Sequence, residues 1–200
     1  MELREQRFGI EIEMTGITRA GAAKVAATYF GTRSEYVGTY YQTYAAVDQE
    51  GRQWKFMSDG SIRAEKKVNG EKRAAGAVYR TEMVSPICRY EDIEKIQELI
   101  RELKKKGAIV NESCGIHVHI DASPFDAGKL RNLTNIMAAK EDLIYKALGV
   151  SVERQHRWCR PVEERFLEEL NRRRPTSMEA VEEIWYNGRS RRGQHYDQSR

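Results

Sequence analysis

The sequence contains few cysteines, and their number and spacing exclude a class of small stapled domains. There are three, Cys88, Cys114 and Cys159. An odd number without paired-ligand spacing argues against a disulfide framework and against a cysteine-rich zinc module. We therefore expect the protein to work in a reducing compartment.

Long apolar runs and a strong excess of one charge are also lacking. No segment approaches the roughly 18 consecutive apolar residues of a membrane helix, and residues 1–9 are charged where a signal peptide would be apolar. The 34 basic and 30 acidic residues leave a net charge of +4, well short of the dense cationic surface typical of nucleic-acid-binding proteins. We expect a cytoplasmic protein without a membrane partner, for which nucleic acid is not the favoured partner.

What the sequence does contain is an ordinary globular composition, with 40% hydrophobic and 32% charged residues over 200 residues. This length suits one compact domain. Residues 7–121 are rich in strand patterns, residues 122–188 are helical in pattern, and residues 189–200 form an irregular tail. Strands followed by helices predict an α+β fold with a curved antiparallel or mixed sheet that carries the site and helices on its outside.

Local patterns predict the individual elements. Residues 7–14 alternate apolar and polar side chains, which predicts a strand with one apolar face. Residues 19–30 are rich in alanine and lie between Thr18, a favourable N-cap, and Gly31, which predicts a short helix. The segment 66–76 is polar, with several lysines and glycines, and is predicted to be a surface loop. Further strands are expected within 37–48, 53–62, 77–87 and 114–121, and further helices within 90–106, 123–148, 162–170 and 177–186.

Three expected strands carry acidic or imidazole side chains on the face opposite their apolar residues. Glu11 and Glu13 share one face of the first strand, and Glu82 lies on a later one. His117 and His119 share a face of a third strand. Each group alone is also compatible with a solvated sheet face. Together, three carboxylates and one or two imidazoles form an oxygen-rich ligand set, which favours Mg²⁺ or Mn²⁺ over zinc and commonly holds phosphates.

A second cluster lies in the segment WKFMSDGSI, which contains Lys55, Asp59 and Ser61. Asp59-Gly60 can form a sharp bend that brings strand and loop side chains to one edge. Two interpretations remain open. The segment is a tight turn with solvated charges, or Lys55 binds a phosphate or substrate carboxylate while Asp59 holds an amine.

Four motifs together resemble those of the amidoligase family, which comprises carboxylate-amine ligases of the glutamine synthetase and glutamate-cysteine ligase superfamily. FGIEIEM, WKFMSDGSI, TEMVSPI and CGIHVHID occur in this order between residues 8 and 121. The resemblance implies a glutamine-synthetase-like catalytic domain that binds ATP and Mg²⁺ or Mn²⁺. It also implies a ligase that joins a small-molecule or peptide carboxylate to an amine through an acyl phosphate.

The resemblance also implies roles for individual residues. The implied metal ligands are Glu11, Glu13, Glu82 and His117. The implied nucleotide-binding residues are His119, Lys55 and Glu82. The implied catalytic segment contains Lys55, Asp59 and Ser61, close to nucleotide or substrate.

One motif of the family is missing. Family members continue with further strands that carry a late Glu-x-Arg motif, and we find no such strand before Arg200. We therefore expect residues 1–200 to form a single, incomplete amidoligase-like catalytic domain. A further C-terminal segment or a second copy of the chain would complete it.

Two other classes of function remain open. The His-x-His strand also resembles the start of a zinc hydrolase site, which needs further ligands, and only His156 and His195 remain for this. A non-catalytic module is the second alternative, either a ligase-like fold without activity or a nucleic-acid-binding domain that uses 172–174 and 189–192. Tightly bound zinc would indicate the hydrolase, and bound Mg²⁺ or Mn²⁺ the ligase. A steep decrease of nucleic-acid affinity with salt concentration would indicate the nucleic-acid-binding domain.

Overall fold

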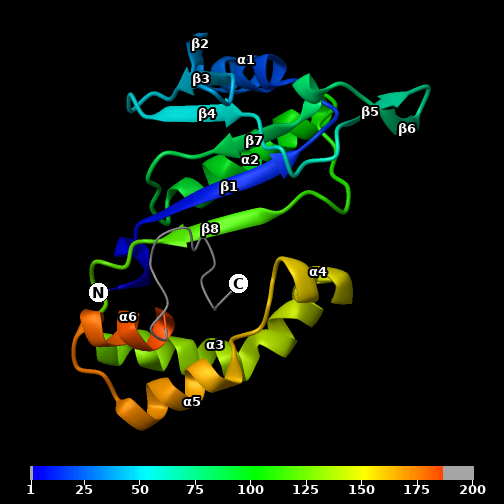
Figure 1. Cartoon of the computed structure of the whole chain (residues 1–200). Helices are drawn as coiled ribbons and strands as arrows, with labels where there is room; N and C mark the ends of the chain where they lie inside the picture. The colour runs from blue at the N-terminus through cyan, green and yellow to red at the C-terminus, as the bar shows by residue number, and fades with distance from the viewer. Residues whose placement is uncertain (1, 187–200) are drawn as a thin grey trace. The chain divides into compact units, whose positions relative to one another are not determined.

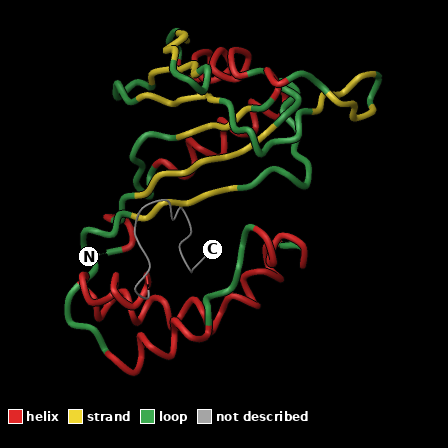
Figure 2. The backbone as a smooth tube through the Cα atoms, viewed as in Figure 1, coloured by secondary structure: helices red, strands yellow, loops and turns green. Residues whose placement is uncertain are grey.

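The computed structural model of the chain describes residues 2–186. Its contacts divide the chain into two compact units, Met1–Asp121 and Ala122–Arg200. Figure 2 shows that the strands belong to the first unit and that the second is helical. That both units form one incomplete catalytic domain stays a prediction. Within the described residues, no helix has the length and apolar character needed to cross a membrane.

The first unit is built on a six-stranded sheet, and every strand pairing described in it is antiparallel. Its strands are β1 (Phe8–Met14), β2 (Ser34–Gly38), β3 (Thr43–Val47), β4 (Gln53–Met57), β7 (Thr81–Val84) and β8 (Ile116–Ile120). They lie in the order β2-β3-β4-β7-β1-β8 (Figure 1). The α+β class and the antiparallel sheet predicted from the sequence are thereby confirmed.

One face of the sheet packs against two helices, α1 (Arg19–Phe30) and α2 (Asp92–Lys105). Alanines on α1 let this helix approach the strands closely, and Trp54 and Phe56 of β4 are fully buried beneath it. Leu99 of α2 joins the same core. Because side chains alternate along a strand, the residues between these core positions point to the opposite face. That second face carries the candidate site.

Helix α1 has the ends that the sequence predicts. The Thr18 hydroxyl accepts a hydrogen bond from the Gly21 N–H at 3.1 Å, which caps the first turn. Gly31 ends the helix with a φ of 67°, in the left-handed region that glycine adopts without strain. Both expected caps of this helix are confirmed.

The expected loop at 66–76 is wrong, because this segment forms a hairpin. Its strands are β5 (Glu65–Val68) and β6 (Glu71–Ala74), which pair antiparallel with each other. Asn69 and Gly70 connect them with φ values of 53° and 86°, and positive φ at both positions is what a two-residue type I′ turn requires. The strand expected over 77–87 is also shorter, because a 3₁₀ turn, η2 (Ala77–Tyr79), precedes β7. A second 3₁₀ turn, η1 (Leu3–Glu5), precedes β1.

The second unit has its own hydrophobic cluster. Its helices are α3 (Ala127–Leu148), α4 (Val152–Arg157), α5 (Glu164–Arg173) and α6 (Met178–Tyr186). Phe166 and Leu170 of α5 pack with Val181 and Ile184 of α6 and with Ala127. The short helix α4 was not expected from the sequence. The separate cluster means that each unit buries apolar surface of its own.

Candidate functional site

The register of β1 brings residues from three strands together. Glu13 lies directly opposite Glu82 of β7, and Glu11 lies directly opposite His117 of β8. Directly paired residues share one face of a sheet, and their side chains are neighbours. The strand alternation predicted from the sequence therefore places these four side chains on the face away from α1 and α2.

Two groups of potential ligand atoms result from this register. In the first, the donor atoms of Glu13, Asp59 and Glu82 all lie within 4.8 Å of one another. In the second, the same limit holds for Glu11, Glu82 and His117. Glu82 belongs to both groups, so the two form one continuous cluster on the sheet. We call these five residues the carboxylate cluster.

Glu13 is the most deeply buried carboxylate of the cluster, with 5% of its surface exposed. The Gly115 N–H donates a hydrogen bond to its Oε2 at 2.6 Å, which fixes one carboxylate oxygen. Burial is the largest influence on the pKa of Glu13 and raises it, and the neighbouring Asp59 adds to this effect. The Gly115 hydrogen bond and His117 oppose the rise without cancelling it.

The pKa of Glu82 is raised in the same way, and to a greater extent. It is 8% exposed, and its pKa is raised to about 7, first by burial and then by the charges of Glu11, Asp59 and Glu13. The charge of His117 opposes this rise. Three neighbouring carboxylates therefore add negative charge around Glu82.

Glu11 holds both imidazoles of β8. Its Oε2 lies 3.0 Å from Nδ1 of His117, and its Oε1 lies 3.3 Å from Nε2 of His119. His117 also belongs to the carboxylate cluster, whereas His119 contacts Glu11 without belonging to either group. Glu11 thus orients two rings whose side chains are half exposed and accessible to a ligand.

Lys55 and Ser61 lie outside the carboxylate cluster. Lys55 pairs with Val84, which in turn pairs with Glu11, so Lys55 is on the same sheet face two strands away, at about 10 Å by the usual strand spacing. The Ser61 backbone N–H donates to Asp59 Oδ1 at 2.7 Å and so fixes the Asp59 side chain. The catalytic roles expected for these residues stay predictions.

Two contributions to the cluster were missed by sequence reasoning. Asp59 was expected to hold an amine, and the structure places it beside Glu13 and Glu82. The signal was its position directly after β4, which is the neighbour of β7 in the sheet. The Gly115 N–H has no side-chain signal at all, because any residue could supply it.

The further residues that the two alternative functions need do not belong to the first unit. His156 lies on α4 of the second unit, and residues 189–192 and 195 lie outside the described part of the chain. Arg172 pairs with Glu169, and Arg173 lies 3.4 Å from Glu183. Their acidic partners compensate these two arginines within the helical unit.

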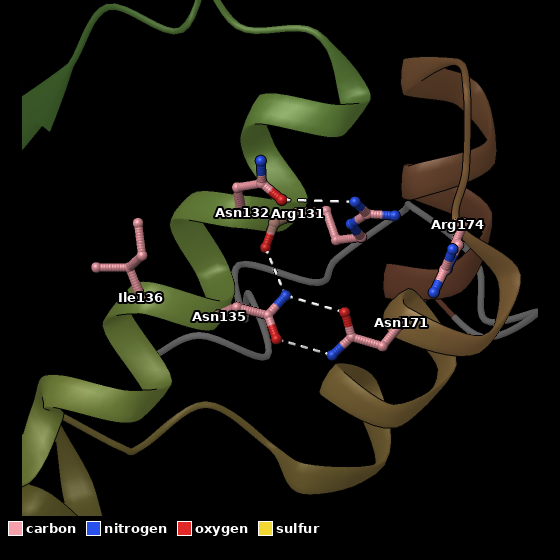
Figure 3. A pocket seen from close by; sticks show the side chains of 6 residues that line it. All are labelled: Arg131, Asn132, Asn135, Ile136, Asn171 and Arg174. Carbon is pink, nitrogen blue, oxygen red and sulfur yellow. Dashed lines mark hydrogen bonds between the residues drawn. The ribbon is translucent and has the colours of Figure 1, made fainter.

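Arg174, the third arginine of that stretch, lines a hollow of about 650 Å³ beside α3 and α5 (Figure 3). Asn135 and Asn171 face each other across it and exchange two amide hydrogen bonds, of 3.0 and 2.8 Å. Arg131, Asn132 and Ile136 complete the lining. This set contains no acidic, imidazole or thiol side chain, and it therefore offers no ligands of the kind found on the sheet.

Comparison with known proteins agrees with the motifs. A family model described as "putative amidoligase enzyme" matches residues 4–200. No curated protein and no solved structure shows a significant match to the chain. The match covers both units and nearly the whole sequence, including the strands that carry the carboxylate cluster. The chain therefore belongs to this amidoligase family.

Proposed function

We propose that the protein is an ATP- and Mg²⁺-dependent ligase that joins a carboxylate to an amine through an acyl phosphate, on a glutamine-synthetase-like sheet. Family membership supports a ligase. The observation that carries the rest is the carboxylate cluster, in which Glu13 and Glu82 are buried and have raised pKa values. Such a cluster is stable in its charged form only when a cation joins it.

The donor set fits a hard divalent cation. Four of its five members are carboxylates and one is an imidazole, and oxygen-rich sets of this kind suit Mg²⁺ or Mn²⁺. Because Glu82 belongs to both ligand groups, it would be shared if both groups were filled. When bound, Mg²⁺ neutralises charge on the transferring phosphoryl group and on the leaving oxygen.

The remaining residues of this sheet face would position the reactants. In the proposed reaction, an oxygen of the substrate carboxylate bonds to the γ-phosphorus as ADP leaves. An amine then displaces phosphate from the carbonyl carbon and loses a proton. The Lys55 ammonium would stabilise the phosphate or the acceptor carboxylate from a fixed position on β4. His119, held by Glu11, would reach the nucleotide phosphates.

Calorimetric titration with Mg²⁺-ATP tests the proposal, with Glu13→Ala as the decisive variant. We expect saturable, Mg²⁺-dependent binding in the natural protein and at least a hundredfold weaker binding in the variant. Glu35→Ala is the matched control, because Glu35 is an exposed glutamate on β2 of the same sheet, and it should bind as the natural protein does.

Two outcomes would contradict the ligase. Undiminished nucleotide affinity in Glu13→Ala would show that the carboxylate cluster does not take part in nucleotide binding. Tightly held zinc without nucleotide affinity, measured by metal analysis of the same sample, would favour a hydrolase built on His117 and His119.

A further inference from the structure

Arg19, the first residue of α1, is a buried arginine with neutral partners. Only 4% of its surface is exposed. Its Nη1 donates to the backbone oxygens of Ala77 and Arg80 at 2.9 and 3.0 Å, and its Nη2 donates to the side-chain oxygen of Gln42. Its Nε is buried and has no hydrogen-bond partner among the described residues. A buried guanidinium is normally paired with an anion, and this one is held by three uncharged oxygens.

The surroundings of Arg19 do not supply the missing negative charge. Burial lowers the pKa of Arg19, and the two opposing influences come from the phenol groups of Tyr44 and Tyr36. Within residues 2–186, the acceptors that meet this guanidinium are two backbone oxygens and an amide oxygen, and none is a carboxylate. Arg80, whose oxygen holds the guanidinium, itself has a buried Nε without a described partner. The Arg19 guanidinium therefore keeps an unused donor, and the oxygens that hold it carry no charge.

Arg19 lines a hollow of about 330 Å³ at the start of α1. The hollow lies where the first backbone N–H groups of the helix give the helix end a partial positive charge. The rings of Tyr36 and Tyr44 lie 4.9 Å apart in its wall and, with Val78, provide apolar surface. The hollow thus combines one buried cation with aromatic walls, and we call it the Arg19 pocket.

The unused donors of Arg19 suit a carboxylate. Nε and Nη2 form one edge of a guanidinium, and a carboxylate binds this edge with two parallel hydrogen bonds. In Arg19 this edge carries only the neutral Gln42 oxygen on Nη2. Gln42 is exposed and lies in the turn before β3 with a φ of 50°, so its side chain can leave without disturbing the core.

We propose that the Arg19 pocket binds the carboxylate of a ligand that also carries an apolar group. Among the described residues that line the pocket, Arg19 is the one cationic side chain, and a single positive charge matches a monoanionic carboxylate rather than a dianionic phosphate. On binding, the carboxylate replaces the Gln42 oxygen and also meets the Nε–H. Tyr36, Tyr44 and Val78 cover the apolar part of the ligand.

Two short segments join this pocket to the carboxylate cluster. Arg80 precedes Glu82 by two residues on the way into β7. The turn that carries Gln42 is tied to the Asp59 loop by a hydrogen bond from the Ser58 N–H to the Tyr41 oxygen at 2.9 Å. The identification of the ligand as a ligase substrate rests on the proposed function, whereas the binding itself does not. In that case the pocket recognises a carboxylate of the substrate.

The test uses three probes that share a phenyl ring, namely benzoate, benzamide and phenyl phosphate, added without metal or nucleotide. Nitrogen-15 NMR of the full chain follows the Arg19 Nε–H signal and the backbone amide of Ala20. We expect saturable shifts of both with benzoate, and at least tenfold weaker binding of benzamide and phenyl phosphate. Equal affinity for benzamide would overturn the ionic contact. Tighter binding of phenyl phosphate would identify a phosphate site instead.

A tethered carboxylate provides a second test that does not disturb the buried arginine. Gln42→Glu places a carboxylate where the Gln42 oxygen already meets Nη2, so benzoate affinity should fall at least tenfold and the melting temperature should rise. Gln49→Glu changes the charge equally in another exposed turn and should alter neither value. Unchanged benzoate affinity in Gln42→Glu would contradict the proposal that the Arg19 pocket binds a carboxylate.

The two proposals can fail separately. Glu13→Ala should lose Mg²⁺-ATP binding and keep benzoate binding, whereas Gln42→Glu should do the reverse. Benzoate binding in a protein that never binds nucleotide would leave the Arg19 pocket standing and refute the ligase. Nucleotide binding without any benzoate response would refute the pocket alone.

Discussion

The sheet unit buries carboxylates in two places, and only one of them contains its own cations. Asp48 and Asp92 are 3% and 7% exposed, and Arg52 donates to both, at 2.9 Å to Asp48 and at 2.7 and 2.9 Å to Asp92. Hydrogen bonds from Arg52 hold the pKa of Asp92 well below its usual range. Burial would raise the pKa of Asp48, but hydrogen bonds from Trp54 and Arg52 reverse the effect.

The carboxylate cluster on the opposite sheet face has the reverse balance. Glu13 and Glu82 are buried to a similar extent, yet their pKa values are raised, first by burial and then by neighbouring carboxylates, because within the described residues no arginine hydrogen bond reverses the effect of burial as it does for Asp48. Equal burial with opposite pKa shifts separates a structural ion-pair cluster from a cluster that requires a cation from solution. Burial alone therefore identifies neither, and the charge of the neighbours decides.

The largest effect should follow from removal of the built-in cation. Arg52→Met leaves Asp48 and Asp92 buried beside Lys95 alone, and loss of one partner of a buried ion pair costs about 3–5 kcal/mol. Urea denaturation should show this loss of unfolding free energy at pH 7. A loss below about 1 kcal/mol would mean that Lys95 already compensates both aspartates.

A smaller effect is expected in the pH dependence of stability, in which the two clusters should differ. Glu82 has a pKa of about 7 in the folded protein against a usual 4.5, so the folded state binds more protons than the unfolded state between these values. Stability of the metal-free protein should therefore fall as the pH rises from 5 to 8, by up to about 3 kcal/mol from this residue. Glu82→Gln should remove this part of the slope.

Addition of Mg²⁺ should change the stability of the natural protein and of Glu82→Gln to different extents. At pH 8 it should restore stability to the natural protein and have little effect on Glu82→Gln, because a ligand that binds only the folded state stabilises it. Parallel pH profiles of the two proteins, measured by urea denaturation in the presence of a chelator, would contradict the assignment of the raised pKa to Glu82.

The smallest effect should come from an exposed ion pair. Arg7 contacts Asp121 next to β1, and half of the Arg7 side chain is exposed. Arg7→Gln should cost about 0.5 kcal/mol, and this cost should vanish in high salt, because solvent screens exposed pairs. A cost close to that of Arg52→Met in the same denaturation assay would show that exposure does not distinguish these ion pairs.

Strand alternation made part of the site predictable. The spacing of Glu11 and Glu13, and of His117 and His119, determines which side chains share a face, and the structure agrees. The order of strands was not predictable in this way, because β1 pairs with segments about 70 and 100 residues away along the chain. The position of Asp59 depends on that order and was therefore missed.

Local signals were also overlooked or absent. The hairpin at 65–74 has an Asn-Gly turn, which is a strong local signal that the lysine-rich composition concealed. Arg19 carries no such signal, because an arginine after an N-cap is normally solvated. Its burial results from Gln42, Ala77 and Arg80, which reach it from distant segments.

Strand β1 lies between β7 and β8, and alternate residues along it serve the site and the core. Glu11 and Glu13 face the candidate site, and Ile12 and Met14 lie on the core side, so each function occupies every second residue of one strand. Insertion of one residue in β1 before Glu11 would exchange the two sets beyond that point and put both glutamates into the core. Length changes in evolution should therefore accumulate in the connecting loops, while strand β1 keeps its length.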